Sequence, residues 1–172
     1  AVVLNPPLIE GLSGSFTEGN TFYSYAAAGV NLADFYTIAT FTNPSDAPAP
    51  FDIGIGFRDD RGSEGGLRFT VTSAGIWYIQ LPGQEPYASG AATSFVSTPG
   101  AINTIEVLVQ GSAGTVAING VLLPQFDFST VPNRGDVYLG AGFFQGDTVE
   151  GRAIAYSDWW IYPTDILDFP SG

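Results

Sequence analysis

Short runs in which apolar and polar residues alternate recur along most of the chain, and clusters of Gly, Pro, Asn and Ser separate them. Alternation with a period of two places one side of a β-strand in a core and the other side in solvent. No window carries the 3.6-residue period of an amphipathic helix, and only residues 128–131 leave room for one short helix. The pattern therefore predicts strands at residues 8–16, 21–26, 35–42, 51–58, 67–72, 76–81, 93–97, 104–110, 115–119, 121–123, 136–143 and 154–162.

The clearest local prediction covers residues 104–123. Asn119-Gly120 lies between apolar residues, and this pair is preferred in a type I′ turn because both positions need positive φ. Residues 111–114 (Gly-Ser-Ala-Gly) supply the preceding turn, so the segment is expected to form a three-stranded meander. A second turn at residues 73–75 joins the strands on either side of it.

Length and composition favour one all-β domain. A chain of 172 residues can bury a substantial core without disulfides. It contains 13 Phe, 8 Tyr and 3 Trp together with 22 Gly and 12 Pro. Many aromatic residues with frequent turn residues are typical of β-sheet proteins that have many turns. We expect a single domain over residues 8–162, with extended arms at 1–7 and 163–172.

The charge of the chain limits its partners. The net charge is −12, and all five positive charges are arginines. Binding to nucleic acid or to an anionic membrane needs a basic surface, which this composition does not supply. No segment approaches the ~20 apolar residues that span a bilayer. We therefore expect no nucleic-acid partner and no membrane insertion.

The residues that are missing argue against most enzymes. The chain has no Lys, His, Cys or Met, so it lacks the usual proton shuttle, thiol nucleophile and Schiff-base amine. Glycoside cleavage would need two carboxylates roughly 5–9 Å apart, and the sequence offers only chance pairs in loops. The absence of Cys and the Ala1 start fit an exported protein at a prokaryotic cell surface, or equally a shortened chain. We expect a protein that binds and does not catalyse.

Three stretches have the order of elements of a known superfamily. Residues 103–120 read as a strand, a glycine turn, a strand and an Asn-Gly pair, residues 135–144 as a later strand, and residues 155–162 as a closing strand rich in aromatics. This order resembles the concanavalin A-like and laminin-G-like jelly rolls. The resemblance implies a two-layer antiparallel β-sandwich and a binding or interaction module, in a group with many carbohydrate-binding members. The Glu-X-Asp-X-X-Glu run of its glucanase members is absent.

One loop suggests a cation site. Asp59, Asp60 and Glu64 lie in the most densely charged stretch of the chain, and oxygen-rich loops can bind Ca²⁺. Calcium is the one cofactor that the sequence suggests. The alternative is a solvated loop in which Arg and Asp side chains pair locally.

Aromatic residues suggest a ligand site. Trp77, Tyr78 and Tyr87 could stack against sugar rings. Adjacent residues of a strand face opposite ways, so one ring of the Trp77-Tyr78 pair, and one of Trp159-Trp160, is expected in the core. Tyr87 is the candidate expected to be exposed.

The apolar arms suggest assembly. An extended apolar segment can add to the edge of a sheet in another copy, or it can pack on its own domain. The candidate assembly residues are Val2, Val3, Leu4, Pro6, Pro7, Ile166, Leu167 and Phe169.

Two functions follow from these patterns. The leading interpretation is an extracellular structural subunit that forms a filament, sheath or surface layer with other copies of itself through its arms. The alternative is a lectin-like carbohydrate-binding module of a larger cell-surface protein, with glycans as partners.

Overall fold

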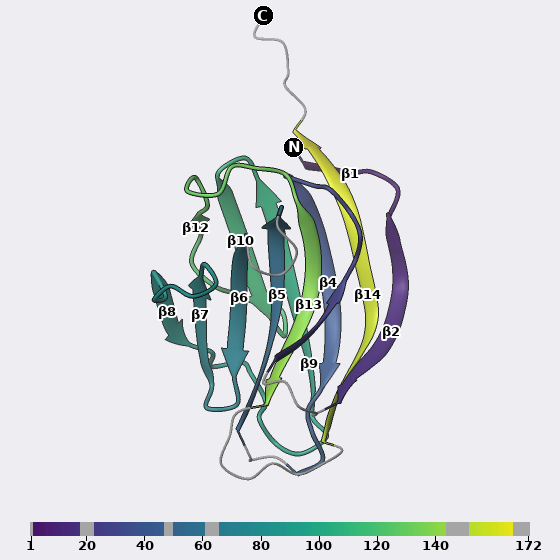
Figure 1. Cartoon of the computed structure of the whole chain (residues 1–172), viewed down its shortest axis with the longest axis vertical. Helices are drawn as coiled ribbons and strands as arrows, with labels where there is room; N and C mark the ends of the chain where they lie inside the picture. The colour runs from purple at the N-terminus through teal and green to yellow at the C-terminus, as the bar shows by residue number, and fades with distance from the viewer. Residues whose placement is uncertain (1, 18–22, 47–49, 61–65, 144–151, 167–172) are drawn as a thin grey trace, which may run out of the picture.

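Two antiparallel sheets pack face to face in the computed structural model, which describes residues 2–17, 23–46, 50–60, 66–143 and 152–166 (Figure 1). The eight-stranded sheet contains, in spatial order, β1 (Val2–Leu4), β14 (Ala153–Ile166), β4 (Phe35–Thr42), β9 (Ile102–Gln110), β10 (Ala113–Ile118) and β11 (Val121–Leu122). In addition, β2 (Ile9–Thr17) pairs with β14, and β12 (Phe126–Asp127) pairs with β10. The six-stranded sheet has the order β3 (Tyr23–Ala27), β13 (Asp136–Phe143), β5 (Phe51–Asp59), β6 (Leu67–Thr72), β7 (Ile76–Gln80) and β8 (Ala88–Ala91).

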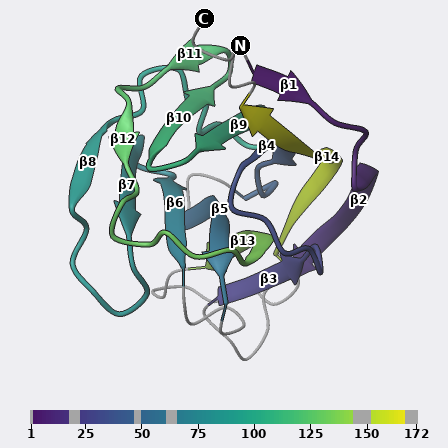
Figure 2. The same cartoon turned by 90° about the horizontal axis from the view of Figure 1, so that it is seen from above.

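This arrangement confirms the predicted two-layer antiparallel sandwich. Seen from above, one sheet follows each side of the molecule, and the chain passes repeatedly between them (Figure 2). The described residues contain no helix, and accordingly none that is long and apolar enough to cross a membrane.

Most predicted strands are confirmed, with three corrections. Residues 93–97 form a loop, and the strand that pairs with β7 is β8, which the sequence analysis assigned to a loop. Residues 128–131 form a turn in which the N–H of Val131 donates to the carbonyl of Phe128, and no helix forms there. The last strand, β14, continues four residues beyond its predicted end at residue 162, to Ile166.

The core fills the space between the sheets with aromatic and branched side chains. Phe57 of β5 packs edge-on against Phe35 of the opposite sheet and against Phe128, with ring centroids 5.7 and 5.1 Å apart. Such edge-to-face pairs add to the free energy gained from apolar burial. Alternate residues of the same strands therefore point outward and are available for function.

The meander of β9, β10 and β11 forms as predicted. Asn119 and Gly120 have φ of 50° and 79°, as a type I′ turn requires. The side chain of Asn119 has a further role that the sequence analysis missed, because it helps to hold the loop over residues 93–98.

Three asparagines replace strand pairing in that loop. Asn103 exchanges two hydrogen bonds of 2.8 Å with the backbone of Val96. Asn43 donates to the carbonyls of Val96 and Thr98 at 2.8 and 2.9 Å, and Asn119 donates to the carbonyl of Ser94 at 2.7 Å. The three amides also bond to one another. Backbone groups that cannot join a sheet are thereby satisfied.

A bulge in β14 determines which tryptophan enters the core. The pairing of β14 with β4 shifts between Ser157 and Trp160, and Asp158 between them has a φ of 50°. The extra residue reverses the alternation. Ile154 and Trp159 therefore both face the core, although residues five positions apart point to opposite sides of a regular strand. Trp159 is thus buried and donates to Thr37 Oγ1 at 3.1 Å, whereas Trp160 is half-buried on the outer face.

Arg58 ties three loops to the end of β5. Its buried guanidinium donates to the carbonyls of Ala33, Val131 and Gly111, and it lies 3.6 Å from a carboxylate oxygen of Asp34. These carbonyls come from segments far apart in the sequence. The side chain therefore acts as a non-covalent crosslink between the two sheets.

We predict that Arg58→Ala lowers the free energy of unfolding by about 3 kcal/mol, because it leaves three carbonyls without their donor. Arg134→Ala is the matched control, since Arg134 is exposed and donates to the carbonyl of Asn31. It should cost less than about 0.5 kcal/mol. Urea unfolding of both variants measures the difference, and equal losses would contradict the role of Arg58.

Candidate functional site

One outer surface, that of the six-stranded sheet, gathers polar and aromatic side chains from five strands. We call it the Arg68 face and define it by Tyr25, Asp52, Arg68, Thr70, Tyr78 and Tyr138. In β6 and β7 the inward neighbours of these residues, Phe69 and Trp77, belong to the core.

Strand register brings these residues together. Gly56 of β5 is paired with Tyr138 on one side and with Arg68 on the other. Paired residues point to the same side of a sheet. Tyr138 and Arg68 therefore reach toward each other across β5, and Arg68 Nε lies 3.4 Å from the Tyr138 hydroxyl, to which it donates.

A glycine makes room for this contact. The ring of Tyr138 crosses β5 above Gly56, where a Cβ atom would lie only 2.0 Å from Tyr138 Cζ. Any larger residue at position 56 would displace the ring. Tyr138 is consequently 1% exposed, and Tyr25, which is 50% exposed, contacts its ring edge-on with centroids 5.9 Å apart.

Asp52 places a buried carboxylate on the same face as Arg68. The residue is 4% exposed, and in the described part of the chain its Oδ1 atom has no hydrogen-bond partner. Burial raises the pKa of Asp52 to about 6, although the Arg68 charge and the N–H of Gly142 act in the opposite direction. At neutral pH the face thus holds a buried carboxylate and, farther along the neighbouring strand β6, a guanidinium.

Two phenols of this face, those of Tyr78 and Tyr138, stay protonated at neutral pH. Burial raises the pKa of Tyr78, and the charge of Asp52 adds to the effect. Burial also raises the pKa of Tyr138. The face therefore combines a partly exposed hydroxyl donor on Tyr78, a cationic donor on Arg68 and the negative charge of the buried Asp52, a set that suits a ligand rich in hydroxyl groups.

Of the three aromatic residues predicted to bind a ligand, the structure places one on this face. Tyr78 is half-buried there, opposite Thr70. Trp77 is 6% exposed and packs in the core against Phe69 and Phe126, so it is not available at the surface. Tyr87 lies just before the edge strand β8 and is 49% exposed. Partial burial of its side chain and the charge of Asp127 raise its pKa to about 12.

The sequence analysis missed Asp52, Arg68 and Tyr138. They are separated by 16 and 70 positions along the chain, and only the register of β13, β5 and β6 brings them together. Their outward position followed from the alternation, but their proximity did not.

The candidate cation site is only partly described. Asp59 is buried at the end of β5 and Asp60 is exposed, while Glu64 lies outside the described residues. Within the ranges that the structure covers, no three His, Cys, Asp or Glu side chains come close enough to hold a metal ion.

Those candidate assembly residues that the structure describes lie along one edge of the eight-stranded sheet. Val2, Val3 and Leu4 pair with residues 164–166 of the same chain, up to Ile166 (Figure 1). Pro6 is exposed and Pro7 half-buried after this strand. Leu167 and Phe169 lie outside the described residues. The described ends of both arms therefore form their backbone hydrogen bonds within the chain.

Solved structures share this fold. The carbohydrate-binding module CBM66 from Bacillus subtilis has a TM-score of 0.64 at 11% identity, over 91% of this chain and 94% of that one. A protein of unknown function with a galectin-like fold from Bacillus subtilis gives 0.60 at 10%, over 95% and 89% of the two chains. A Bacillus licheniformis β-glucanase gives 0.56 at 8%, over 89% and 77%. These likenesses confirm the concanavalin A-like jelly-roll fold.

Comparison at the level of sequence adds nothing to this. No family model matches the chain, and no curated protein matches it.

We predict that Asp52 makes stability depend on pH. Because its pKa is near 3.8 when unfolded and about 6 when folded, the folded state binds more protons between these values. The contribution of Asp52 to the free energy of unfolding therefore falls as pH rises from 4 to 7, by about 3 kcal/mol at most. Asp52→Asn should match the wild-type stability at pH 4 and exceed it at pH 7. Thermal unfolding across this range measures the effect, and a pH-independent difference would disprove it.

Proposed function

We propose that this protein is a non-catalytic carbohydrate-binding module that holds a glycan on its Arg68 face. The observation that carries the proposal is the joint position of Asp52, Arg68, Tyr78 and Tyr25 on one side of one sheet. Two of these side chains are charged and two are aromatic, and all four belong to strands and not to loops. Sites built on strands hold their side chains in a defined geometry.

A protein recognises a sugar through hydrogen bonds to its hydroxyl groups and through apolar contact with its ring. Ring hydroxyls can accept hydrogen bonds from the half-buried Arg68 guanidinium, and such charge-assisted hydrogen bonds are strong. The C–H groups of a sugar ring form an apolar side that packs against an aromatic ring. Tyr25 and Tyr78 present partly exposed rings on either side of the Arg68 charge.

The comparisons support the same class. The neighbour called a carbohydrate-binding module is nearly the same size as this chain, since the match covers 94% of it. A β-glucanase shares the fold as well, but hydrolysis needs two carboxylates that face each other roughly 5–9 Å apart. On the described Arg68 face Asp52 is buried and shares the surface with an arginine, an arrangement that favours binding over catalysis.

The proposal includes an extracellular or cell-surface location, where a glycan-binding module meets its ligand. It replaces the filament-forming subunit as the leading hypothesis. No observation on the described residues favours self-assembly, and β1 pairs within its own chain.

Glycan binding is tested with an array of oligosaccharides, followed by calorimetric titration of the ligands that bind. We expect Arg68→Met and Tyr78→Ala each to weaken binding roughly tenfold or more, because each removes a direct contact. Arg134→Ala removes the same charge as Arg68→Met from a different part of the surface and should leave the affinity unchanged.

Two results would overturn the proposal. One is an array with no bound glycan at any concentration tested. The other is a glycan whose affinity is the same for the wild type, Arg68→Met and Tyr78→Ala, since that ligand would bind elsewhere.

A further inference from the structure

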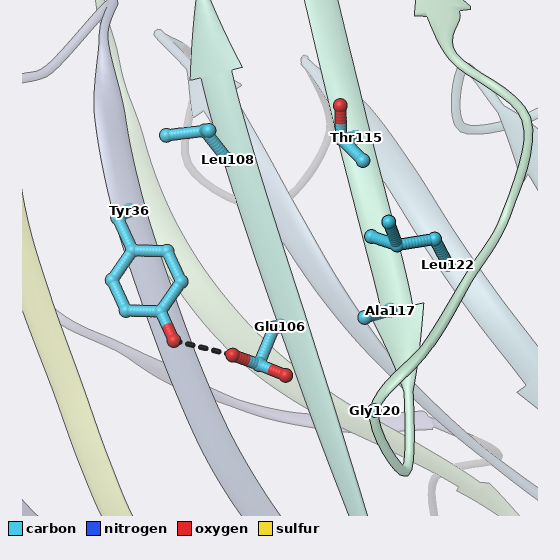
Figure 3. Close-up of a pocket in the computed structure, with 7 residues that line it drawn as sticks. All are labelled: Tyr36, Glu106, Leu108, Thr115, Ala117, Gly120 and Leu122. Atoms are coloured by element: carbon cyan, nitrogen blue, oxygen red, sulfur yellow. Dashed lines mark hydrogen bonds between the residues drawn. The ribbon is translucent and has the colours of Figure 1, made fainter. Parts of the chain in front are cut away.

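A pocket of about 270 Å³ opens on the other sheet, away from the Arg68 face. We call it the Tyr36–Glu106 pocket (Figure 3). Its lining comes from β4, β9, β10 and β11 and consists of Tyr36, Glu106, Leu108, Thr115, Ala117, Gly120 and Leu122.

Strand register also brings the residues of this pocket together. Tyr36, Leu108 and Thr115 are paired in one row across β4, β9 and β10, and Glu106, Ala117 and Leu122 form the next row. Their neighbours along the strands, such as Phe35, Val107 and Val116, lie in the core. The pocket residues therefore project from the outer surface of a rigid sheet.

One hydrogen bond fixes the acidic end of the pocket. The hydroxyl of Tyr36 donates to Glu106 Oε1 at 2.5 Å. Burial and the Glu106 carboxylate both raise the pKa of Tyr36, so the phenol remains a donor. Figure 3 shows the second carboxylate oxygen of Glu106 pointing away from Tyr36. No arginine in the described part of the chain forms an ion pair with Glu106.

The remaining lining is mostly apolar. Leu108 and Ala117 lie on β9 and β10, and Leu122, which is 69% exposed, comes from β11 (Figure 3). The ring of Tyr36 lies on the other side of Glu106. A ligand that matches this lining has an aliphatic stem and ends in a cation that reaches the carboxylate.

We propose that the Tyr36–Glu106 pocket binds a primary ammonium group carried on an aliphatic stem, as in a lysine side chain or a free alkyldiamine. An ammonium is a compact charge that can bind through one carboxylate oxygen, whereas a guanidinium binds best to two. Tyr36 already occupies one of the two oxygens of Glu106. The pocket therefore selects lysine over arginine.

The charge of the protein supports this ligand. The net charge of −12 attracts cations. The chain contains no lysine, so a second copy cannot supply this side chain, and the group must come from a different molecule. The proposal does not rest on glycan binding by the Arg68 face, which lies on the other sheet.

The first experiment compares probes by calorimetric titration or ligand-observed NMR at low ionic strength. The probes are Nα-acetyl-lysine methylamide, its norleucine and arginine analogues, and 1,5-diaminopentane. We expect the lysine derivative to bind at least tenfold more tightly than norleucine, which has the stem without the charge. The diamine separates the two sources: tighter binding of the diamine indicates a free amine, and tighter binding of the lysine derivative indicates a polypeptide.

The second experiment uses variants of equal charge. Glu106→Gln keeps the shape of the side chain and should weaken ammonium binding roughly tenfold. Glu85→Gln removes the same charge from an exposed loop residue and should have no effect. Tyr36→Phe frees Oε1 of Glu106, so that both carboxylate oxygens can bind a ligand. It should preserve lysine binding and raise the affinity for the arginine derivative.

Three results would overturn the inference. They are no binding of either amine by the wild type, equal binding of the norleucine and lysine derivatives, and equal loss of affinity in Glu106→Gln and Glu85→Gln. None of these depends on whether a glycan binds the Arg68 face.

Discussion

The apolar contact between the two sheets is the constraint on which both surfaces depend. It fixes which side of each strand is buried, because a shift by one residue would turn every core side chain into solvent. Rings such as Phe35 and Phe57 interlock across the interface. Once they are buried, the alternate residues must point outward, and strand register decides which of them become neighbours. Arg68 and Tyr138 meet for the same reason that Tyr36 and Glu106 do.

Two local departures from regular sheet geometry allow this core to form. The bulge at Asp158 changes the phase of β14 so that Trp159 is buried on one side of the bulge and Ile154 on the other. Arg58, with a φ of 54°, turns its side chain into the end of the sandwich, where loop carbonyls need donors. A residue in this conformation is strained, and the strain is offset by hydrogen bonds that no neighbouring backbone group supplies.

Alternation in the sequence was enough to predict most strands, because it records burial directly, whereas the sandwich was predicted from the resemblance to the concanavalin A-like jelly rolls. Prediction from alternation failed in segments whose structure does not depend on burying apolar side chains. The strand β8 has the sequence Ala-Ser-Gly-Ala, which is too weakly apolar to stand out. The segment 93–97 looks like a strand, yet its backbone is held by the side chains of Asn43 and Asn103. Tyr78 was predicted from the sequence as a ligand-binding residue, whereas its neighbours on the Arg68 face required the register, which depends on contacts distant in sequence.

The two surfaces differ in what they can select. On the Arg68 face, a buried carboxylate and a guanidinium carry opposite charges, and the Arg68 charge acts on Asp52, so a neutral ligand with many hydroxyls is favoured. In the Tyr36–Glu106 pocket a neutral phenol takes one oxygen of the carboxylate and leaves its charge in place. The two acids thus differ in their surroundings, because Asp52 is buried on a face that also carries an arginine, whereas Glu106 accepts a hydrogen bond from a tyrosine. This difference supports a neutral ligand on the Arg68 face and a cation in the Tyr36–Glu106 pocket. If both proposals hold, the core between the two surfaces lets the protein bind both ligands at once.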